Sequence, residues 1–515
     1  MRPNRFDYAD VVAFCLVLCT GVITIWQATA RQLTNVNTET DFIGAFQPEA
    51  ARFMSGQPME ILFHPPGYPI SLATVYSIVN DWFTAGLVIS VFCAITVLVA
   101  SYLCFRELVG PFAGLGALVA LLGSAVFWSF SIQSTSDIHF LAIWCLTLYT
   151  AIIAMRRQVP WQWLALGVLI SIGVLSRTNG IVLMLLMFAP FLTDRPVSTR
   201  FKNALIVVLA TAAPILSWLL YSSIIGSPFM PTKTFANLAL TYFSSERISG
   251  DARIMLESQF TSSWQVLMAD PMQVFQIYIR DLIRLPVNLL VRVTWKPLAL
   301  LCFICSLAWI YKVKDIRIFT LITVTLAMTA LTNMKAFEAR YYLYMLPIGG
   351  ASIGLALIKL SEMRPHWIKK PSIQNSSLLV LAILAFYVSG FSGFERAENR
   401  VLSAQFVEMA SEIQNKTPDN SIIMCRKCNG AYHSQRSTIF FPQIDTIEDL
   451  CRELQASYSS FPIFIAIGES EKIMRMELSK ELMSQPLPEW LELTAEGKGN
   501  NPWKLIRYKH EASCN

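Results

Sequence analysis

About eleven apolar segments, most of them long enough to cross a lipid bilayer, dominate this sequence. A spanning helix needs roughly 17–25 such residues. Charged residues make up 15% of the 515-residue chain, against about 25% in an average soluble protein. The sequence therefore predicts an all-α membrane protein with many spans. The expected spans are Val11–Ala30, Phe83–Phe105, Leu108–Phe130, Ile138–Met155, Trp161–Leu175, Ile181–Leu192, Ala204–Ile225, Pro297–Ile310, Ile318–Leu331, Leu343–Ile358 and Leu378–Phe391.

The distribution of Lys and Arg predicts the orientation of these spans, because cytoplasmic loops carry an excess of both. Alternate loops are basic, beginning with Arg2 and Arg5, whereas the short loops between them hold only Arg177, Lys335 and Arg340. The N-terminus is then expected inside and the C-terminus outside. Cleavage of the first segment as a signal peptide is an alternative, and it would leave the same regions outside. The net charge of +6 without a Lys/Arg block argues against nucleic-acid binding.

Two domains are expected: a membrane domain over residues 1–391, with outer loops 31–82 and 226–296, and a small α/β domain over residues 392–515. In the second, the helix pattern "VLSAQFVEMASEIQNK" is followed by the strand patterns "SIIMC" and "STIFFP", then by "TIEDLCRELQAS" and "FPIFIAIG". The tail also holds Cys425, Cys428, Cys451 and Cys514. In an oxidising compartment these favour a disulfide, with free thiols or a zinc site that includes His433 as alternatives.

The outer loops are expected to lie along the membrane surface. In the first, Phe42, Phe46, Ala50 and Phe53 recur at helical spacing, and the run "HPPGYP" then indicates a stiff extended link. In the second, "DPMQVFQIYIRDLIRLPVNLLVRVTWK" predicts an interfacial helix whose cations either extend to the surface or bind an anionic headgroup.

Two carboxylates lie where a reaction at headgroup depth would need one. Asp41 follows the first span at the start of the amphipathic helix, and Asp137 begins the fourth span. Either can serve only as a helix N-cap, or can have a chemical role. Arg340 opens a late span beside three tyrosines; it can pair with Glu338 or bind a phosphate through two N–H groups.

In order and topology these features resemble the GT-C integral membrane glycosyltransferases, close to the dolichyl-phosphate-mannose protein mannosyltransferases and lipid A aminoarabinose transferases. The matching features are Asp41 with the Phe46–Ala50–Gly56 pattern, the "PPGYP" run, a second acid at Asp137, and "RYYLYMLP". The chain departs from the pattern at His64, where many members carry Lys or Arg. The tail resembles bacterial members, which implies an inner membrane with a periplasmic C-terminal domain.

The resemblance implies inverting transfer of a sugar from a polyprenyl-phosphate donor to an acceptor glycan, lipid or protein outside. Asp41 would be the general base and Asp137 a second catalytic acid that positions the base or acceptor, or holds a metal. Arg340, His64, Tyr341 and Arg284 would bind the donor phosphate. No cofactor is predicted, although a divalent metal is an alternative. A lipid or sugar transporter, or a sugar-binding subunit without chemistry, are the rival functions.

Overall fold

The computed structural model describes the chain from Tyr8 to Lys509. The description omits residues 31–40, 62, 245–255, 308, 310–313, 336, 363–378, 385–386, 394–403, 426–430, 432–433, 435, 441–443, 445, 458–460, 469–475, 485 and 498–501. The chain forms two compact units. One comprises Met1–Arg31, Glu49–Thr232 and Pro271–Ala397, and the other comprises Gln32–Pro48, Lys233–Asp270 and Glu398–Asn515.

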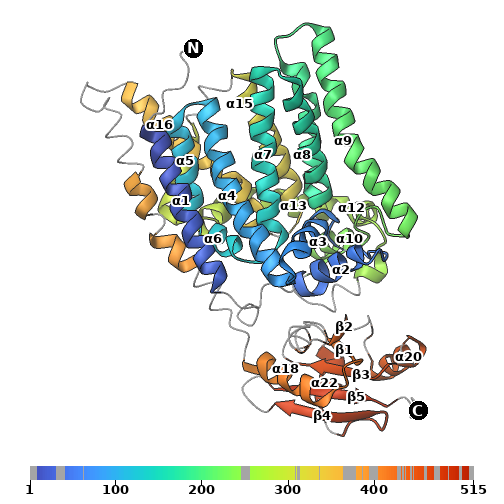
Figure 1. The fold of residues 1–515 in the computed structure, drawn as a ribbon. Helices are drawn as coiled ribbons and strands as arrows, with labels where there is room; N and C mark the ends of the chain where they lie inside the picture. The colour runs from blue at the N-terminus through green and yellow to red at the C-terminus, as the bar shows by residue number, and fades with distance from the viewer. Residues whose placement is uncertain are drawn as a thin grey trace. The chain divides into compact units, whose positions relative to one another are not determined.

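The first unit is a bundle of apolar helices, several of which run side by side in Figure 1. Within the described residues, every expected span coincides with one or more helical segments. In the described part of the chain, five helices are long and apolar enough to cross a membrane alone, or six if one bent pair is a single span. Eleven spans are therefore not confirmed. The long helices are α1 (Tyr8–Thr29), α4 (Trp82–Leu108), α7 (Ser136–Arg157), α9 (Val197–Ile225) and the stretch Ala339–Lys359. The shorter ones include α8 (Pro160–Ser176), α14 (Lys296–Ser306) and α15 (Ile316–Thr332).

The third expected span, Leu108–Phe130, is broken into α5 (Pro111–Leu122) and α6 (Ala125–Ser131), which are bent by 76°. Hydrogen bonds pair the backbone N–H and C=O groups at the break, as a lipid environment requires. The Ser124 side chain accepts a hydrogen bond from the Phe127 N–H, and the Gly123 carbonyl accepts one from Thr294 at 2.6 Å. Trp128 donates to the Leu122 carbonyl at 2.8 Å.

The sixth expected span, Ile181–Leu192, lies within η3 (Thr178–Leu192), a 15-residue 3₁₀ helix. A 3₁₀ helix rises about 2.0 Å per residue, so these residues extend roughly 30 Å, close to the thickness of a bilayer core. An α-helix of the same length would reach only about 22 Å. The tighter winding therefore gives this segment, which is short in sequence, a length close to that thickness.

Helices α5 and α16 (Leu346–Glu362) pack in close contact with each other. A Cβ at Gly116 would clash with the carbonyl oxygen of Gly350, and a Cβ at Gly350 would clash with Gly116 in turn. Small residues of this kind let membrane helices approach backbone to backbone.

The first outer loop contains η2 (Phe42–Phe46), α2 (Gln47–Met54) and α3 (Gly67–Val79). The helix stop expected at Gly56 is present: Gly56 has a φ of 66°, and the Gln57 N–H donates to the Arg52 carbonyl at 2.9 Å. The stiff extended link expected at "HPPGYP" is wrong in its second half, because Gly67, Tyr68 and Pro69 form the first turn of α3. Proline is compatible with a first helical turn, whose N–H groups have no intrahelical partner.

The second outer loop supplies α10 (Thr234–Phe243), α12 (Ser263–Ala269) and α13 (Pro271–Arg292). Met272, Phe275 and Ile283 on α13 are 60–72% exposed. An exposed apolar face of this kind is what the predicted interfacial helix requires.

The C-terminal residues of the second unit form a five-stranded sheet of order β2-β1-β3-β5-β4. Strand β1 is parallel to β2 and β3, whereas β5 is antiparallel to β3 and β4. The sheet packs on helices through a core that includes Leu450, Ile465 and Ile506. Cys425 and Cys451 are disulfide-bonded, and the zinc alternative involving Cys428 and His433 falls on residues that are not described. The elements are β1 (Ile422–Cys425), β2 (Ser437–Phe440), β3 (Ile463–Ile467), β4 (Leu491–Gly497), β5 (Trp503–Tyr508), α18 (Ala404–Lys416), α20 (Ile447–Ser457) and α22 (Met476–Met483).

Candidate functional site

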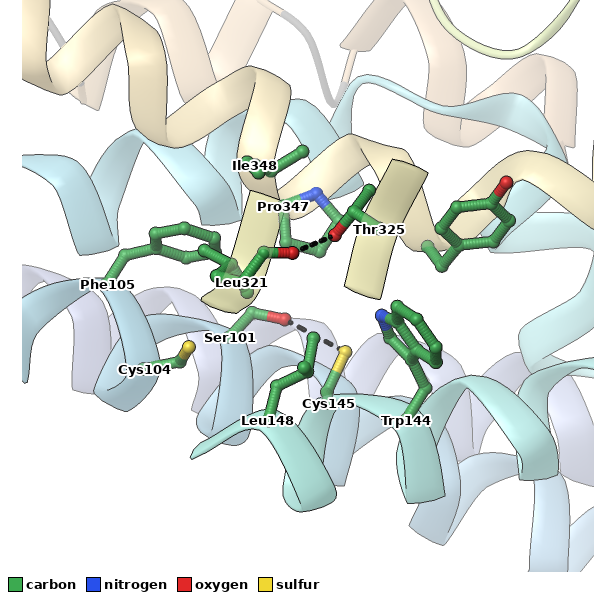
Figure 2. A pocket seen from close by; sticks show the side chains of 11 residues that line it. Ser101, Cys104, Phe105, Trp144, Cys145, Leu148, Leu321, Thr325, Pro347 and Ile348 are labelled. Atoms are coloured by element: carbon green, nitrogen blue, oxygen red, sulfur yellow. Dashed lines mark hydrogen bonds between the residues drawn. The ribbon is translucent and has the colours of Figure 1, made fainter. Parts of the chain in front are cut away.

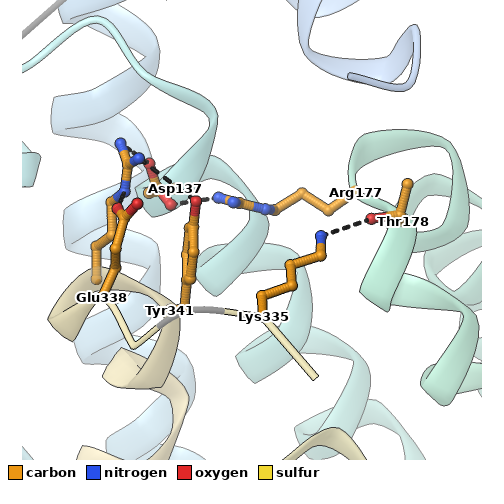
Figure 3. Close-up of polar contacts among 7 residues, drawn as sticks. Asp137, Arg177, Thr178, Lys335, Glu338 and Tyr341 are labelled. Atoms are coloured by element: carbon orange, nitrogen blue, oxygen red, sulfur yellow. Dashed lines mark hydrogen bonds and ion pairs between the residues drawn. The ribbon is translucent and has the colours of Figure 1, made fainter. Parts of the chain in front are cut away.

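An ionic cluster lies in the first unit where α7, η3 and η5 (Ala339–Met345) pack together. We use this name for Asp137, Arg177, Lys335, Glu338, Arg340 and Tyr341, which Figure 3 shows in close-up. Its centre is Asp137, which lies in the first turn of α7. Asp137 is 7% exposed. A carboxylate this deeply buried must be paired with positive charge to remain ionised without a large energetic cost.

Two arginines supply that positive charge. Arg177 donates a hydrogen bond to one oxygen of Asp137, and Arg340 Nη1 lies 3.6 Å from the other. Arg177 can reach Asp137 because α8 ends at Ser176, where the backbone turns extended (φ −150°, ψ 147° at Arg177) before η3 begins. The predicted role of Asp137 as an N-cap has no support in the geometry, because Asp137 lies inside the helix and its carboxylate contacts the two arginines.

Tyr341 lies between the two guanidinium groups. Its ring centroid is 5.2 Å from Arg177 and 5.1 Å from Arg340, so both cations contact the aromatic face. Arg340 also pairs with Glu338 at 2.5 Å, so the ion-pair alternative for Arg340 is confirmed, whereas phosphate binding by Arg340 stays a prediction. A tyrosine between two arginines fixes the direction of both side chains.

Lys335 lies between α15 and η5 and donates a long hydrogen bond of 3.4 Å to Thr178. No carboxylate among the described residues lies within ion-pair distance of it. Burial, followed by the positive charge of Arg177, lowers the pKa of Lys335 to about 8. The sequence prediction did not assign Lys335 or Arg177 to the site. The available signal was their presence in the short outer loops, which are otherwise poor in cations.

The ionic cluster has an excess of positive charge. Three cations (Arg177, Lys335, Arg340) against two carboxylates (Asp137, Glu338) leave +3 − 2 = +1. His64 is near enough to interact electrostatically with Asp137 and would add to that excess when protonated. A buried or half-buried group of this charge is suited to binding one anionic group, such as a phosphate diester.

Two other predicted site residues, Arg284 and Asp41, are not members of the ionic cluster. Arg284 is exposed on α13 and forms no ion pair with a described residue. Asp41 belongs to the second unit, where it is half-buried immediately before η2 and its side chain does not cap that helix. The roles of both residues stay predictions.

His139, two residues after Asp137 on α7, is a packed side chain. It is 8% exposed, contacts the Tyr68 ring edge-on at 5.5 Å, and lies 3.3 Å from the Ser71 hydroxyl. These contacts give His139 a structural role in packing α7 against α3.

A small cavity between α4, α7 and α15 is too small to be a substrate site (Figure 2). Its volume of about 20 Å³ is enough for one water molecule. Ser101 donates a hydrogen bond to the Cys145 sulfur at 3.5 Å on its wall.

Within the described residues, no group of three or more His, Cys, Asp or Glu side chains could hold a metal ion. Metal dependence therefore stays untested.

Comparison with known proteins identifies the fold. Residues 63–218 match the family described as dolichyl-phosphate-mannose-protein mannosyltransferase. ArnT from Cupriavidus metallidurans bound to undecaprenyl phosphate superposes with a TM-score of 0.60 at 12% identity, and the match covers 98% of each chain. The Archaeoglobus fulgidus oligosaccharyltransferase in complex with zinc and sulfate gives 0.56 at 11% identity over 90% of this chain and 70% of that one.

A second structure of the Archaeoglobus fulgidus enzyme, AglB in complex with an inhibitory peptide and a dolichol-phosphate, gives a TM-score of 0.53 at 12% identity. That match covers 88% of this chain and 69% of the other. No curated protein sequence matches the chain. The predicted resemblance to GT-C membrane glycosyltransferases is confirmed: the chain has their fold, and its residues 63–218 carry the sequence pattern of the mannosyltransferase family.

Proposed function

We propose that this protein is an inverting glycosyltransferase that moves a sugar from a polyprenyl-phosphate donor to an acceptor on the outer face of the membrane. The observation that carries the proposal is the ionic cluster, a net-positive group within a fold whose solved examples include one bound to undecaprenyl phosphate. The acceptor class, whether glycan, lipid or protein, is left open.

The donor phosphate would be held by cations of the ionic cluster. Lys335 and Arg340 are the first candidates, because Lys335 has no carboxylate partner among the described residues and Arg340 has five N–H donors to share. His64, Tyr341 and Arg284 remain weaker candidates for the same task. As the bond from the anomeric carbon to the phosphate oxygen breaks, negative charge grows on the leaving phosphate. Fixed cations stabilise that charge without reorganisation.

The acceptor hydroxyl must lose its proton as its oxygen attacks the anomeric carbon. Asp41 is the proposed general base, a role worth about 10²–10⁴ in rate. The polyprenyl phosphate departs with the bonding electrons and is already a weak base, so no strong general acid is needed. A single displacement inverts the anomeric configuration.

Asp137 would act as a positioning residue in this scheme. Its carboxylate contacts two guanidinium groups, which makes it a poor proton acceptor and a firm anchor for Arg177 and Arg340. No metal is required by the scheme.

The test is turnover by purified protein in lipid nanodiscs, with a panel of polyprenyl-phosphate sugars and with glycan, lipid and peptide acceptors. Asp41→Asn keeps the shape of the side chain but cannot take a proton, so it should lose at least about 10² in transfer rate while it still binds donor. Glu39→Gln is the matched control and should lose much less.

Full activity of Asp41→Asn would remove Asp41 as the base and make Asp137 the next residue to test. If no donor yields product and the protein instead moves lipid-linked sugar between leaflets, the transporter alternative is correct.

A further inference from the structure

An apolar groove lies on the lipid-exposed surface between η3 and α9. Its volume is about 560 Å³, and its lining is entirely apolar, with Met184 and Phe188 on η3 and Leu205 and Val208 on α9 among the residues that form it. Phe188 is 63% exposed and Leu205 is 58% exposed. The groove is therefore open to the membrane along its length and has the volume and polarity to hold hydrocarbon chains.

Three cations stand near one end of this groove, on either side of the residue where α9 begins. Arg195 lies in the connection from η3 to α9, and Arg200 and Lys202 lie in the first two turns of α9; Asp194 is the single acid in that connection. Arg200 is held in place by its own hydrogen bonds: its Nε donates to the Arg195 carbonyl at 2.6 Å, and its Nη1 donates to the Phe191 carbonyl at 3.4 Å.

One cation contacts the apolar lining, because Arg200 donates to the backbone carbonyl of Phe191, a residue that lines the groove. Phe191 and Phe201, both of which line the groove, pack edge to face at 5.3 Å. Arg200 and Lys202 flank Phe201 in sequence. Arg195 and Lys202 are exposed, and neither side chain forms an ion pair with a described residue. Their charges are therefore available to a ligand.

We propose that this groove binds an anionic phospholipid, with the acyl chains in the apolar groove and the headgroup phosphate against Arg195, Arg200 and Lys202. A basic pocket at the end of a membrane-facing groove is the arrangement that selects anionic headgroups. The charge complementarity favours an anionic over a zwitterionic lipid.

This lipid site is distinct from the ionic cluster. Arg177 precedes η3 and Arg195 follows it, so the two cationic groups lie at opposite ends of a 15-residue 3₁₀ helix, roughly 30 Å apart along its axis. Under the predicted topology the phospholipid belongs to the inner leaflet. A polyprenyl phosphate in the ionic cluster would have its phosphate at the other membrane surface.

The experiment is native mass spectrometry of delipidated, detergent-purified protein titrated with phosphatidylglycerol or with phosphatidylcholine of the same acyl chains. The wild type should bind phosphatidylglycerol more tightly. In the double variant Arg195→Gln/Lys202→Gln its affinity should fall about 25-fold, since each cation near the surface contributes about a factor of five. Phosphatidylcholine affinity should change little.

Two further variants separate headgroup from chain effects. Lys314→Gln, which removes an exposed cation from another predicted inner loop, should bind both lipids as the wild type does. Leu205→Trp, which places a larger side chain in the groove, should weaken both lipids to a similar extent. Equal wild-type affinity for the two lipids, or a double variant that binds like the wild type, would overturn the proposal. Displacement of phosphatidylglycerol by one equivalent of undecaprenyl phosphate would also overturn it, because the groove would then belong to the donor.

Discussion

Arg177, Lys335 and Arg340 are the cations that the predicted topology leaves in the short outer loops, and all three meet in the ionic cluster. Outer loops carry few cations because positive charge favours the cytoplasmic side. A cation that remains there has a structural or chemical reason: Arg177 and Arg340 pair with Asp137, and Lys335 donates to Thr178. The exceptions to the charge pattern thus pointed to the site more directly than any single motif.

Lys335 should make donor binding depend on pH. Its pKa of about 8, lowered from the usual value near 10.5 by burial and by Arg177, means that it is charged at pH 7 and becomes neutral as the pH rises through 8. A polyprenyl-phosphate sugar is a diester with one constant negative charge over this range. Its affinity, measured by titration at pH 7 and pH 9, should therefore fall as the pH rises.

The variant Lys335→Arg provides the control for this effect, because a guanidinium stays protonated at both values. It should bind donor with the same affinity at pH 7 and pH 9. Lys335→Met should bind weakly at both. If the wild-type affinity is unchanged between these pH values, Lys335 does not bind the donor phosphate.

Asp137 should matter for stability as well as for activity. Asp137→Ala leaves two guanidinium groups without their shared partner, and loss of one partner from a buried ion pair costs about 3–5 kcal/mol. The lower end applies, because the side chain of Arg340 is 24% exposed. Thermal unfolding in detergent, followed by tryptophan fluorescence, measures the change.

Glu60→Ala is the control variant. It removes a carboxylate from an ion pair in the same unit, in which the side chains of Arg52 and Glu60 are 35% and 53% exposed. It should cost no more than about 1 kcal/mol. Equal loss of stability in the two variants would mean that the ionic cluster adds nothing beyond an ordinary surface pair.

Sequence reasoning found Asp137, Arg340 and Tyr341 by their positions at the mouths of spans, and the structure brings these three together. It could not pair Asp137 with Arg177, because 40 residues and two helices separate them and no periodicity links the two. The sequence could not predict the lowered pKa of Lys335 either, because the burial of this side chain depends on tertiary packing.

At the scale of elements, hydrophobicity located the helices but not their breaks or winding. The α5–α6 break depends on hydrogen bonds from Thr294 and Trp295, about 170 residues away, to Gly123. The 3₁₀ winding of η3 gives 15 residues the length that an α-helix reaches with about 20. The break and the winding result from tertiary contacts, which a local pattern of apolar residues does not predict.

The α5–α16 contact offers a test at this scale. Gly350→Ala places a Cβ against the carbonyl oxygen of Gly116, so the helices must separate and thermal stability should fall by more than about 1 kcal/mol. Gly349→Ala is the matched control on the same helix. Its Cβ would lie 3.4 Å from the Cys302 Cβ, an ordinary contact, and alanine favours helix, so stability should hold or rise. The two variants should behave alike only if α5 and α16 pack more loosely than the structure places them.

At the scale of the whole molecule, the proposed chemistry depends on which side of the membrane each region faces. The fold is that of membrane glycosyltransferases, and the apolar helices confirm an integral membrane protein. The side of each loop is still set only by the Lys and Arg pattern of the sequence. A disulfide at Cys425 and Cys451 agrees with an oxidising compartment for the C-terminal residues.

Fusion of reporters that work on only one side of a membrane tests this orientation. Alkaline phosphatase, which needs an oxidising compartment, should be active when fused after Asn515 and inactive when the fusion joins at Lys202. A cytoplasmic reporter such as green fluorescent protein should give the reverse pattern. The physical reason is the excess of Arg and Lys near Lys202 and in the other predicted inner loops. Activity of the phosphatase at Lys202 would place Arg195 and Lys202 outside, and the ionic cluster, at the other end of η3, inside. Sugar transfer at that cluster would then have to draw on a cytoplasmic acceptor, and the outer-face reaction proposed for Asp41 would be excluded.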